Sequence, residues 1–312
     1  MGLSSKDILG LEHMPASDIE LILETAQSMK DILGRQIKKT PTLRGRSIIT
    51  IFFENSTRTR TSFEMAAKVM SADISSIAVA ASSVAKGESL KDTILTLQAM
   101  KPDAFIIRHQ SSGAPHFISR LVPSCVINAG DGTHEHPSQA LLDMLTIVEN
   151  KGRLDGLTVA IVGDIMHSRV ARSNMWGLTK MGAKVRFVGP RTLIPADAEK
   201  LPVEVLTNLE EGIKGADVIN VLRIQMERMT KGLFPSTREY SQLFGITTER
   251  LKAAKDDVIV LHPGPMNRGI EIAADVADSR QCAVLEQVTN GVAVRMAMLY
   301  LLLGGTDDAI TA

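Results

Sequence analysis

Apolar, strand-like runs alternate with helix-like segments along most of this chain, and the alternation restricts its fold more than any other feature. A first set of strand–helix pairs follows a predicted amphipathic helix over 17–33 that begins near Ser17. Its pairs lie at 47–53 and 57–70, 75–80 and 88–100, 103–109 and 114–121, and 125–130 and 138–150. Strands that alternate with helices in this way predict a parallel sheet covered by helices.

A second set of alternating segments begins after Lys151-Gly152. Its predicted strands lie at 157–164, 184–190, 203–208, 217–222 and 257–265, and its predicted helices at 169–181, 196–200 and 210–214. A chain of 312 residues is long enough for two domains of ordinary size. We therefore expect an α/β protein of two parallel-sheet domains, 1–140 and 141–287. The segment 288–312, helical over 288–304, is expected to pack back onto the first domain.

The charge balance and the cysteines exclude several classes of protein. The chain has 35 Lys and Arg against 35 Asp and Glu, whereas surfaces that bind nucleic acid or acidic membranes carry an excess of basic residues. Cys125 and Cys282 are far apart, which predicts neither a disulfide framework nor a cysteine zinc site. Charged residues within 1–20 argue against a signal peptide, and Arg295 interrupts the most apolar run, 292–304. We therefore expect a soluble cytoplasmic protein without a nucleic-acid or membrane partner.

The junction between the first strand and its helix, residues 52–64, is rich in hydroxyl and guanidinium groups. It contains Ser56, Thr57, Arg58, Thr59 and Arg60. The free N–H groups and the dipole of a helix N-terminus favour an anion, and Arg58 can add a planar pair of donors. The junction therefore predicts a phosphate-binding site.

A capped helix start is the alternative interpretation of the same junction. Ser56 or Thr61 would be the N-cap, and Glu64 would complete a capping box. Capping requires only one hydroxyl, however, and it does not explain two arginines at a helix end where the dipole disfavours cations.

Polar side chains also follow the other predicted strands, at the edge where open parallel sheets bind their ligands. In the first domain these are Ser82, Ser83, Lys86, Glu88, Arg108, His109 and the run 131–139; in the second they are His167, Ser168, Arg169, Arg172, Arg223, Gln225, the run 262–265 and Arg268. The predicted fold directs several of these cations into one cleft between the domains. That pattern suits a substrate with several negative charges, such as a phosphate plus carboxylates.

Two cofactor-based alternatives have less support. The turn at Gly163 lacks the two further glycines with which a dinucleotide-binding loop approaches a pyrophosphate. His134 and His136, together with His262, could form a metal site, but no third ligand has a fixed spacing. His136, restrained by the following Pro137, fits an imidazole that donates a hydrogen bond to a carbonyl at least as well. A purely structural role for His136 is the remaining alternative.

Seven short motifs occur in order along most of the chain. They are STRTR at 56–60, KGES at 86–89, RH at 108–109, HPSQALLD at 136–143, HSR at 167–169, RIQMER at 223–228 and HPGPMNRG at 262–269. Together they resemble the catalytic chains of the aspartate carbamoyltransferase family. The resemblance implies that carbamoyl phosphate and L-aspartate react to N-carbamoyl-L-aspartate and phosphate, in the synthesis of pyrimidines. It also implies an active site with neither a metal nor an organic cofactor.

The resemblance further implies a role for individual residues. The implied ligands of carbamoyl phosphate are Ser56, Thr57, Arg58, Thr59, Arg108, His136, Gln139, and the backbone carbonyls of Pro263 and Gly264. The implied ligands of aspartate are Lys86, Arg169, Arg223 and Gln225, and the implied catalytic residues are Arg58, Thr59, Lys86, Arg108 and His136. Ser82 and Lys86 would reach the active site of a neighbouring subunit, and either Ser82 or Ser83 would contact the substrate there. A homotrimer with active sites at its subunit interfaces is thus implied.

The resemblance and the residues imply the same mechanism. The neutral amine of aspartate attacks the carbonyl carbon, and phosphate leaves from a tetrahedral intermediate while the arginines, His136 and the helix N-terminus stabilise the charge. The segment 226–240 is expected to be a variable loop that bears on closure over aspartate. The resemblance leaves open whether regulatory chains or a dihydroorotase join the trimer.

An ornithine carbamoyltransferase is the closest rival, because it would share the phosphate motif. Such enzymes carry a catalytic cysteine in an HCLP motif and a Ser-Met-Gly loop, whereas this chain has HPGP at 262–265 and no Ser-Met-Gly. A cationic amino acid would also meet Arg169 and Arg223 unfavourably. A catalytically silent scaffold is the rival from another class, and the retention of all the charged motif residues argues against it.

Overall fold

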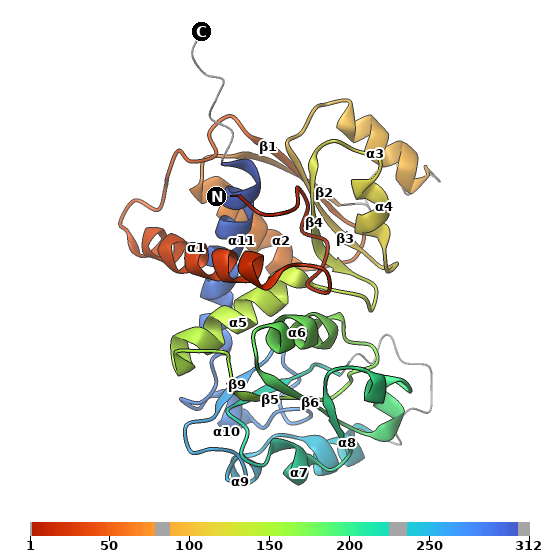
Figure 1. The fold of residues 1–312 in the computed structure, drawn as a ribbon, viewed down its shortest axis with the longest axis vertical. Coiled ribbons are helices and arrows are strands. Elements are labelled where there is room, and N and C mark those ends of the chain that lie inside the picture. The colour runs from red at the N-terminus through yellow and green to blue at the C-terminus, as the bar shows by residue number, and fades with distance from the viewer. Residues whose placement is uncertain (1, 79–87, 225–235, 305–312) are drawn as a thin grey trace. The chain divides into compact units, whose positions relative to one another are not determined.

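A computed structural model describes residues 2–78, 88–224 and 236–304 of the chain (Figure 1). The chain divides into two compact units, here named unit 1 and unit 2. Unit 1 comprises Met1–Leu142 with Thr289–Ala312, and unit 2 comprises Asp143–Val288. Two long helices, α5 (Pro137–Lys151) and α11 (Val284–Leu303), contribute residues to both units.

Unit 1 contains a four-stranded parallel sheet. Its strands are β1 (Ser47–Phe52), β2 (Asp73–Ala78), β3 (Ala104–His109) and β4 (Cys125–Asp131), in the order β2-β1-β3-β4. The chain thus adds β2 on one side of β1 and then β3 and β4 on the other. Residues 48–52 of β1 are all buried, as expected for a parallel strand whose two faces are both covered.

Four further helices belong to unit 1: α1 (Ala16–Gly34), α2 (Thr57–Val69), α3 (Leu90–Gln98) and α4 (Ala114–Ser119). Ile94 of α3 and Ile118 of α4 pack with strand residues such as Ile51, Phe105 and Val126 in a buried apolar cluster. The β-branched and aromatic residues that form the strands therefore also form the core of this unit.

Unit 2 contains a five-stranded parallel sheet. Its strands are β5 (Thr158–Val162), β6 (Lys184–Val188), β7 (Glu204–Leu206), β8 (Val218–Val221) and β9 (Ile259–Leu261), in the order β7-β6-β5-β8-β9. Its helices are α6 (Arg169–Lys180), α7 (Leu209–Ile213), α8 (Thr237–Phe244), α9 (Thr248–Leu251) and α10 (Ala274–Ala277), with 3-10 turns η3 (Arg191–Leu193) and η4 (Ala198–Lys200). Strand and helix side chains share one buried apolar cluster.

The predicted fold class is confirmed, since both sheets are parallel and each of the nine predicted strands contains one observed strand or overlaps it. Some local predictions were wrong. The start of the first helix resembled a Ser17 N-cap in the sequence, but Pro15 is the N-cap residue of α1. The segment 226–240 is not a loop throughout, because α8 begins at Thr237, where Ser236 caps the helix through a hydrogen bond from the Glu239 N–H. The segment near 196–200 forms the 3-10 turn η4 in place of an α-helix.

Arg295 is buried within the apolar helix α11, where both terminal nitrogens of its guanidinium donate hydrogen bonds within unit 1. Nη1 donates to the Gly291 carbonyl (2.9 Å), Nη2 donates to Ser138 Oγ (3.2 Å), and the guanidinium carbon lies 5.0 Å from the ring centre of Phe63. This one residue therefore links α11 to α5 and α2. Among the helices described, none is both long and apolar enough to span a membrane.

Candidate active site

The STRTR motif lies where β1 ends and α2 begins. Ser56 is the N-cap residue of α2, but its side chain makes no capping hydrogen bond. Glu64 does not close a capping box either, since it accepts a hydrogen bond from Ser76 Oγ (2.6 Å) and lies 3.8 Å from Arg60 Nε. The capping interpretation is therefore wrong for this helix. Arg60 has an acidic neighbour within its own helix.

Arg108 lies beside this junction because β3 is the neighbour of β1. Phe52 pairs with Arg108 in the sheet register, and the Phe53 N–H donates to the Arg108 carbonyl (2.9 Å). The side chain is held by Glu54, whose Oε2 lies 3.3 Å from Nε, and by the Ala129 carbonyl, 3.2 Å from Nη1. The strand order reverses between β1 and β3, and ligands of open parallel sheets bind at such a point. Sequence reasoning missed Glu54, although its place after a strand was a usable signal.

His109 follows Arg108 and has a local structural role. Its ring contacts Phe53, with 4.6 Å between the ring centres, and its Nδ1 accepts the Ser111 N–H (2.8 Å). Burial lowers the pKa of His109, which favours the neutral ring that this acceptor role requires.

His136 and Gln139 lie at the start of α5, beyond the end of β4. His136 is only 4% exposed and Gln139 9%. The His136 carbonyl accepts the Gln139 N–H (3.0 Å), so the two residues share the first helical turn. Pro137 occupies the first helical position, where its missing N–H costs nothing. The local sequence thus fixes both predicted ligands of the carbamoyl group on one helix end in unit 1.

The loop before His136 is organised by Asp131, which is fully buried. Its carboxylate accepts the Gly113 N–H (2.6 Å), Asn128 Nδ2 (2.8 Å) and the Glu135 N–H (3.1 Å), and it lies 3.1 Å from His134 Nδ1. Burial alone would raise the pKa of Asp131, but the hydrogen bonds outweigh burial and hold the pKa below its usual value. The loop therefore contains an ionised carboxylate of fixed position.

In unit 2, Arg169 and Arg223 follow β5 and β8, which are neighbours where the strand order of the second sheet reverses. Arg169 is the first residue of α6 and is 4% exposed, while Ser168 caps the helix by accepting the Ala171 N–H (3.1 Å). Gly163 follows β5 with φ of +129°, and a Cβ there would lie 3.2 Å from Leu222 Cβ. Glycine thus permits the close approach of the two segments that carry the arginines.

Asp164 positions the segment between Gly163 and Arg169. It is fully buried, and its Oδ1 lies 2.8 Å from His167 Nδ1 and accepts the His167 N–H (3.2 Å). Within the HSR motif, His167 is therefore held by Asp164. Asp164 was not identified as a positioning residue from the sequence.

Pro263 and Gly264 follow β9 in unit 2, where His262 sets their conformation. His262 Nδ1 accepts the Gly264 N–H (2.8 Å), and its Nε2 lies 3.1 Å from Glu271 Oε1, with both side chains fully buried. The Gln287 side chain accepts the His262 N–H (2.9 Å). A neutral His262 that carries its proton on Nε2 satisfies both ring contacts. His262 is therefore engaged in the shape of this loop.

Four predicted site residues lie outside the described residues: Ser82, Ser83, Lys86 and Gln225. Their roles stay predictions. The metal alternative had grouped His134 with His136 and His262, and the structure groups the histidines differently. Among the described residues, the sets that could share an ion are His116, Asp131 and His134, and Glu12, His134 and Glu135.

The whole length of the chain matches known proteins. Residues 6–149 match the family domain described as aspartate/ornithine carbamoyltransferase, carbamoyl-P binding domain, and residues 155–302 match the Asp/Orn binding domain of the same family. The chain is 65% identical to the aspartate carbamoyltransferase catalytic subunit of Moorella thermoacetica, over 98% of this chain and 100% of that one.

Solved structures of two kinds of enzyme share the fold. Aspartate transcarbamoylase from Trypanosoma cruzi, in complex with N-(phosphonacetyl)-L-aspartic acid, is 31% identical with a TM-score of 0.88, over 96% of this chain and 97% of that one. Ornithine carbamoyltransferase from Pyrococcus furiosus is 30% identical with a TM-score of 0.86, over 98% and 99%. The fold alone thus does not separate the two amino-acid substrates. This chain belongs to the aspartate/ornithine carbamoyltransferase family.

Proposed function

We propose that this chain is the catalytic subunit of an aspartate carbamoyltransferase, which converts carbamoyl phosphate and L-aspartate to N-carbamoyl-L-aspartate and phosphate in pyrimidine synthesis. The observation that carries the choice of amino acid is the pair Arg169 and Arg223 at the switch point of the unit 2 sheet. Two guanidinium groups complement two carboxylates and repel the side-chain ammonium of ornithine. The curated relatives with 65% and 62% identity, from Moorella thermoacetica and Heliobacterium modesticaldum, bear the aspartate name.

In the proposed site, Ser56, Thr57, Arg58 and Thr59 bind the phosphate group, and Arg108 bridges toward the phosphate and carbonyl oxygens. His136 and Thr59 donate to the carbonyl oxygen. The Gln139 side chain and the backbone carbonyls of Pro263 and Gly264 accept hydrogen bonds from the NH2 of the carbamoyl group. Arg169, Arg223 and Gln225 bind the carboxylates of aspartate. The N-terminus of α2 supports the phosphate role, because the side chain of its N-cap residue Ser56 makes no capping hydrogen bond.

The proposed reaction needs no covalent enzyme intermediate. The amine lone pair of aspartate forms a bond to the carbonyl carbon, and the bond from that carbon to the phosphate oxygen then breaks. The departing phosphate accepts the proton that the amine loses. Arg58, Arg108 and His136 stabilise the charge that develops on the carbonyl oxygen and the leaving group, so the catalysis is electrostatic and orientational.

The substrate is tested by assaying carbamoyl transfer to aspartate and to ornithine in parallel. We expect product from aspartate only, and inhibition by N-(phosphonacetyl)-L-aspartic acid. Product from ornithine alone, or from neither amino acid, would overturn the proposed function.

The phosphate role is tested by comparing Arg58→Ala with Arg60→Ala. We expect Arg58→Ala to cost on the order of 3 kcal/mol in the chemical step, roughly a hundredfold in kcat. Arg60 contacts Glu64 in its own helix, so its removal is expected to change kcat by less than about threefold. Equal losses in the two variants would remove the distinction between the arginines, and near-normal turnover of Arg58→Ala would contradict the assignment.

A further inference from the structure

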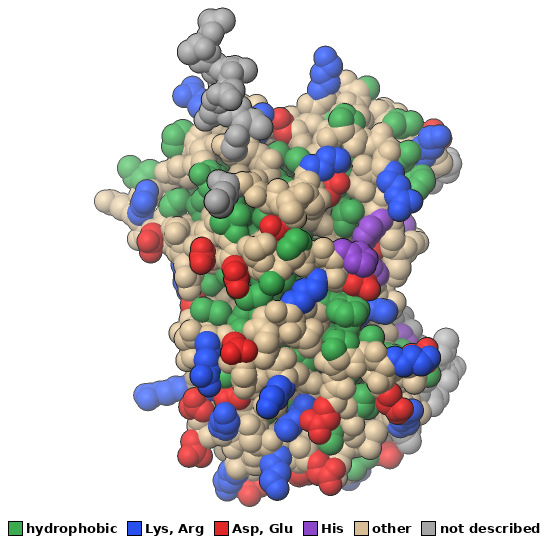
Figure 2. All heavy atoms as spheres, viewed as in Figure 1, with side chains coloured by type: hydrophobic (Ala, Val, Ile, Leu, Met, Phe, Trp, Pro, Cys, Tyr) green, Lys and Arg blue, Asp and Glu red, His purple; other side chains and the backbone are tan. Residues whose placement is uncertain are grey.

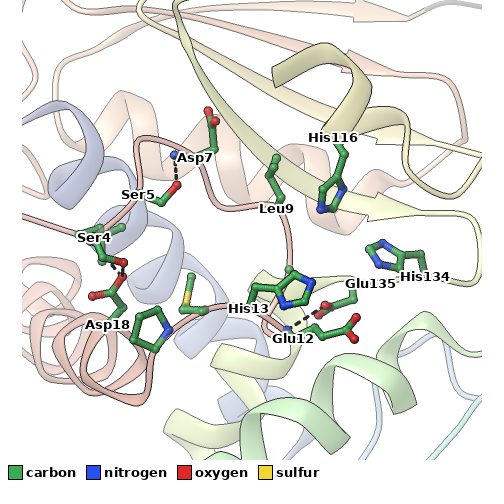
Figure 3. A pocket seen from close by; sticks show the side chains of 14 residues that line it. Ser4, Ser5, Asp7, Leu9, Glu12, His13, Asp18, His116, His134 and Glu135 are labelled. Carbon is green, nitrogen blue, oxygen red and sulfur yellow. Dashed lines mark hydrogen bonds between the residues drawn. The ribbon is translucent and has the colours of Figure 1, made fainter. Parts of the chain in front are cut away.

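Three side chains that the proposed reaction does not use meet on one side of unit 1. His116 lies on α4, Asp131 ends β4, and His134 lies in the loop between β4 and α5. One ligand atom from each lies within 4.8 Å of the other two. Figure 3 shows the rings of His116 and His134 directed toward one another at the wall of a pocket. A nitrogen–nitrogen–oxygen set of this kind is typical of sites for zinc and similar divalent ions.

The cluster has a fixed oxygen ligand. Asp131 is fully buried, and Gly113 and Asn128 donate to its carboxylate at 2.6 and 2.8 Å. His134 Nδ1 lies 3.1 Å from the same carboxylate, at Oδ2. Metal-binding sites hold their ligands through such outer hydrogen bonds, which fix orientation before the ion binds.

The cluster also contains an unsatisfied nitrogen. His116 Nδ1 is buried and has no hydrogen-bond partner within the part of the chain that the structure describes. The two histidine rings are 5.4 Å apart between centres and nearly perpendicular. A buried ring nitrogen without a partner costs free energy, and coordination of an ion is one way to remove that cost.

The distances require only local movement. Ligand atoms of a tetrahedral zinc ion lie roughly 3.3 Å apart, given zinc–nitrogen and zinc–oxygen bonds of about 2 Å. The three atoms already lie within 4.8 Å of one another, so each pair would have to approach by at most about 1.5 Å. Water can complete the coordination from the pocket, which has a volume of about 260 Å³ and is lined by His13, Glu12, His116 and His134 among others. Figure 2 shows histidine side chains gathered at one place on the face drawn.

We propose that His116, Asp131 and His134 form a binding site for a divalent transition-metal ion such as Zn²⁺, which clamps α4 to the loop that leads into α5. The second candidate set, Glu12, His134 and Glu135, contributes only one nitrogen. Zinc prefers the set with two imidazoles.

The experiment uses the full chain in its native assembly, freed of metal by chelation and dialysis. Zn²⁺ binding is measured by calorimetry and by competition with a chromophoric chelator, and Co²⁺ serves as a spectroscopic probe of tetrahedral geometry. We expect one ion per chain, a tetrahedral Co²⁺ spectrum and a higher melting temperature with Zn²⁺ than without it. His116→Asn and His134→Asn are each expected to weaken binding at least about tenfold.

His13→Asn is the matched control, because His13 lines the same pocket and belongs to neither ligand set. It is expected to leave affinity and stoichiometry unchanged, while circular dichroism without metal checks that every variant is folded. Absence of a stoichiometric ion, or equal affinity in the wild type and both ligand variants, would overturn the proposal. A loss in Glu12→Gln and His134→Asn but not in His116→Asn would also overturn it, since the ion would then lie in the other set.

Discussion

Glu135 fastens the N-terminal segment to the loop that carries His136. Its side chain is 1% exposed and accepts the Leu11 N–H (2.7 Å) and the Glu12 N–H (3.1 Å). Its own N–H donates to Asp131 (3.1 Å), so one residue connects the first residues of the chain with the entrance to α5. The position of the neighbouring His136 therefore depends in part on contacts that Glu135 makes with the N-terminal segment.

Glu135→Ala is therefore expected to destabilise the folded chain. The buried Leu11 N–H would lose this acceptor, whereas the Glu12 N–H can turn to water, so we expect a loss of about 1–3 kcal/mol in the free energy of unfolding. Glu135→Gln keeps one oxygen and should lose less. Urea denaturation measures both. Glu20→Ala on the exposed side of α1 is the control, and a Glu135→Ala midpoint that matches this control would contradict the expectation.

At the scale of elements, Asp143 gathers three segments of unit 2 around one carboxylate. This fully buried residue of α5 accepts Asn174 Nδ2 of α6 (2.8 Å), Asn220 Nδ2 of β8 (3.2 Å) and Gln287 Nε2 of α11 (2.7 Å). Gln287 in turn accepts the His262 N–H after β9 (2.9 Å). The network thus reaches the loop that contains Pro263 and Gly264.

We expect Asp143→Ala to be among the most destabilising substitutions in unit 2. It leaves three buried amide groups without this acceptor, and the expected loss is about 3 kcal/mol or more. Asp143→Asn preserves the shape but places a donor against the donors of its neighbours, so it too should unfold at lower temperature. Asp197→Ala removes an exposed pair with Lys200 and should cost less than about 0.5 kcal/mol. Differential scanning calorimetry that found equal losses in Asp143→Ala and Asp197→Ala would refute the role of the network.

The same elements show how far the sequence could predict this fold. Strands such as β1 and β8 were predicted from local apolar runs, because burial on both faces of a parallel sheet removes polar residues from the strand. The order β2-β1-β3-β4, which pairs Phe52 with Arg108, depends on contacts between distant segments and left no local signal. The helix α10 has only four residues, too few for a helical period. Asp143 was visible only as one residue of the HPSQALLD motif, since its three partners lie 31, 77 and 144 positions away.

At the scale of the whole molecule, each unit carries its own pair of predicted cationic ligands at its own switch point. In unit 1, Arg58 follows β1 and Arg108 lies in β3. In unit 2, Arg169 follows β5 and Arg223 follows β8. The chain has no net charge, so these pairs are local concentrations of positive charge. The anionic groups of the two substrates of the proposed reaction, the phosphate and the aspartate carboxylates, are accordingly expected to depend on different units.

Arg223→Ala tests this division of substrates between the units. Loss of a hydrogen-bonded charge contact to a carboxylate should raise the KM for aspartate by about 10- to 100-fold. The KM for carbamoyl phosphate should change less than about threefold, because Arg223 is not among its proposed ligands and its phosphate is expected to bind unit 1. Steady-state kinetics with each substrate varied in turn measures both constants. A KM for carbamoyl phosphate that rises as much as that for aspartate would contradict the division.

The proposed homotrimer makes a quantitative prediction about mixed assemblies. We expect Lys86 of one chain to complete the active site of its neighbour. A Lys86→Ala chain retains an intact Arg58, and an Arg58→Ala chain retains an intact Lys86. In a mixed trimer, a site is then active when the chain that supplies Arg58 is the Lys86→Ala variant and the neighbour that supplies Lys86 is the Arg58→Ala variant. Each interface in a cyclic assembly joins two neighbouring chains. After random reassembly of equal amounts, the probability that a site's own chain is Lys86→Ala is one half, and so is the probability that the donating neighbour is Arg58→Ala. About a quarter of the sites should therefore regain activity. Sedimentation should show a trimer, and mixing without dissociation is the control. Activity that stays at the level of the separate variants after verified reassembly would mean that each chain completes its own site.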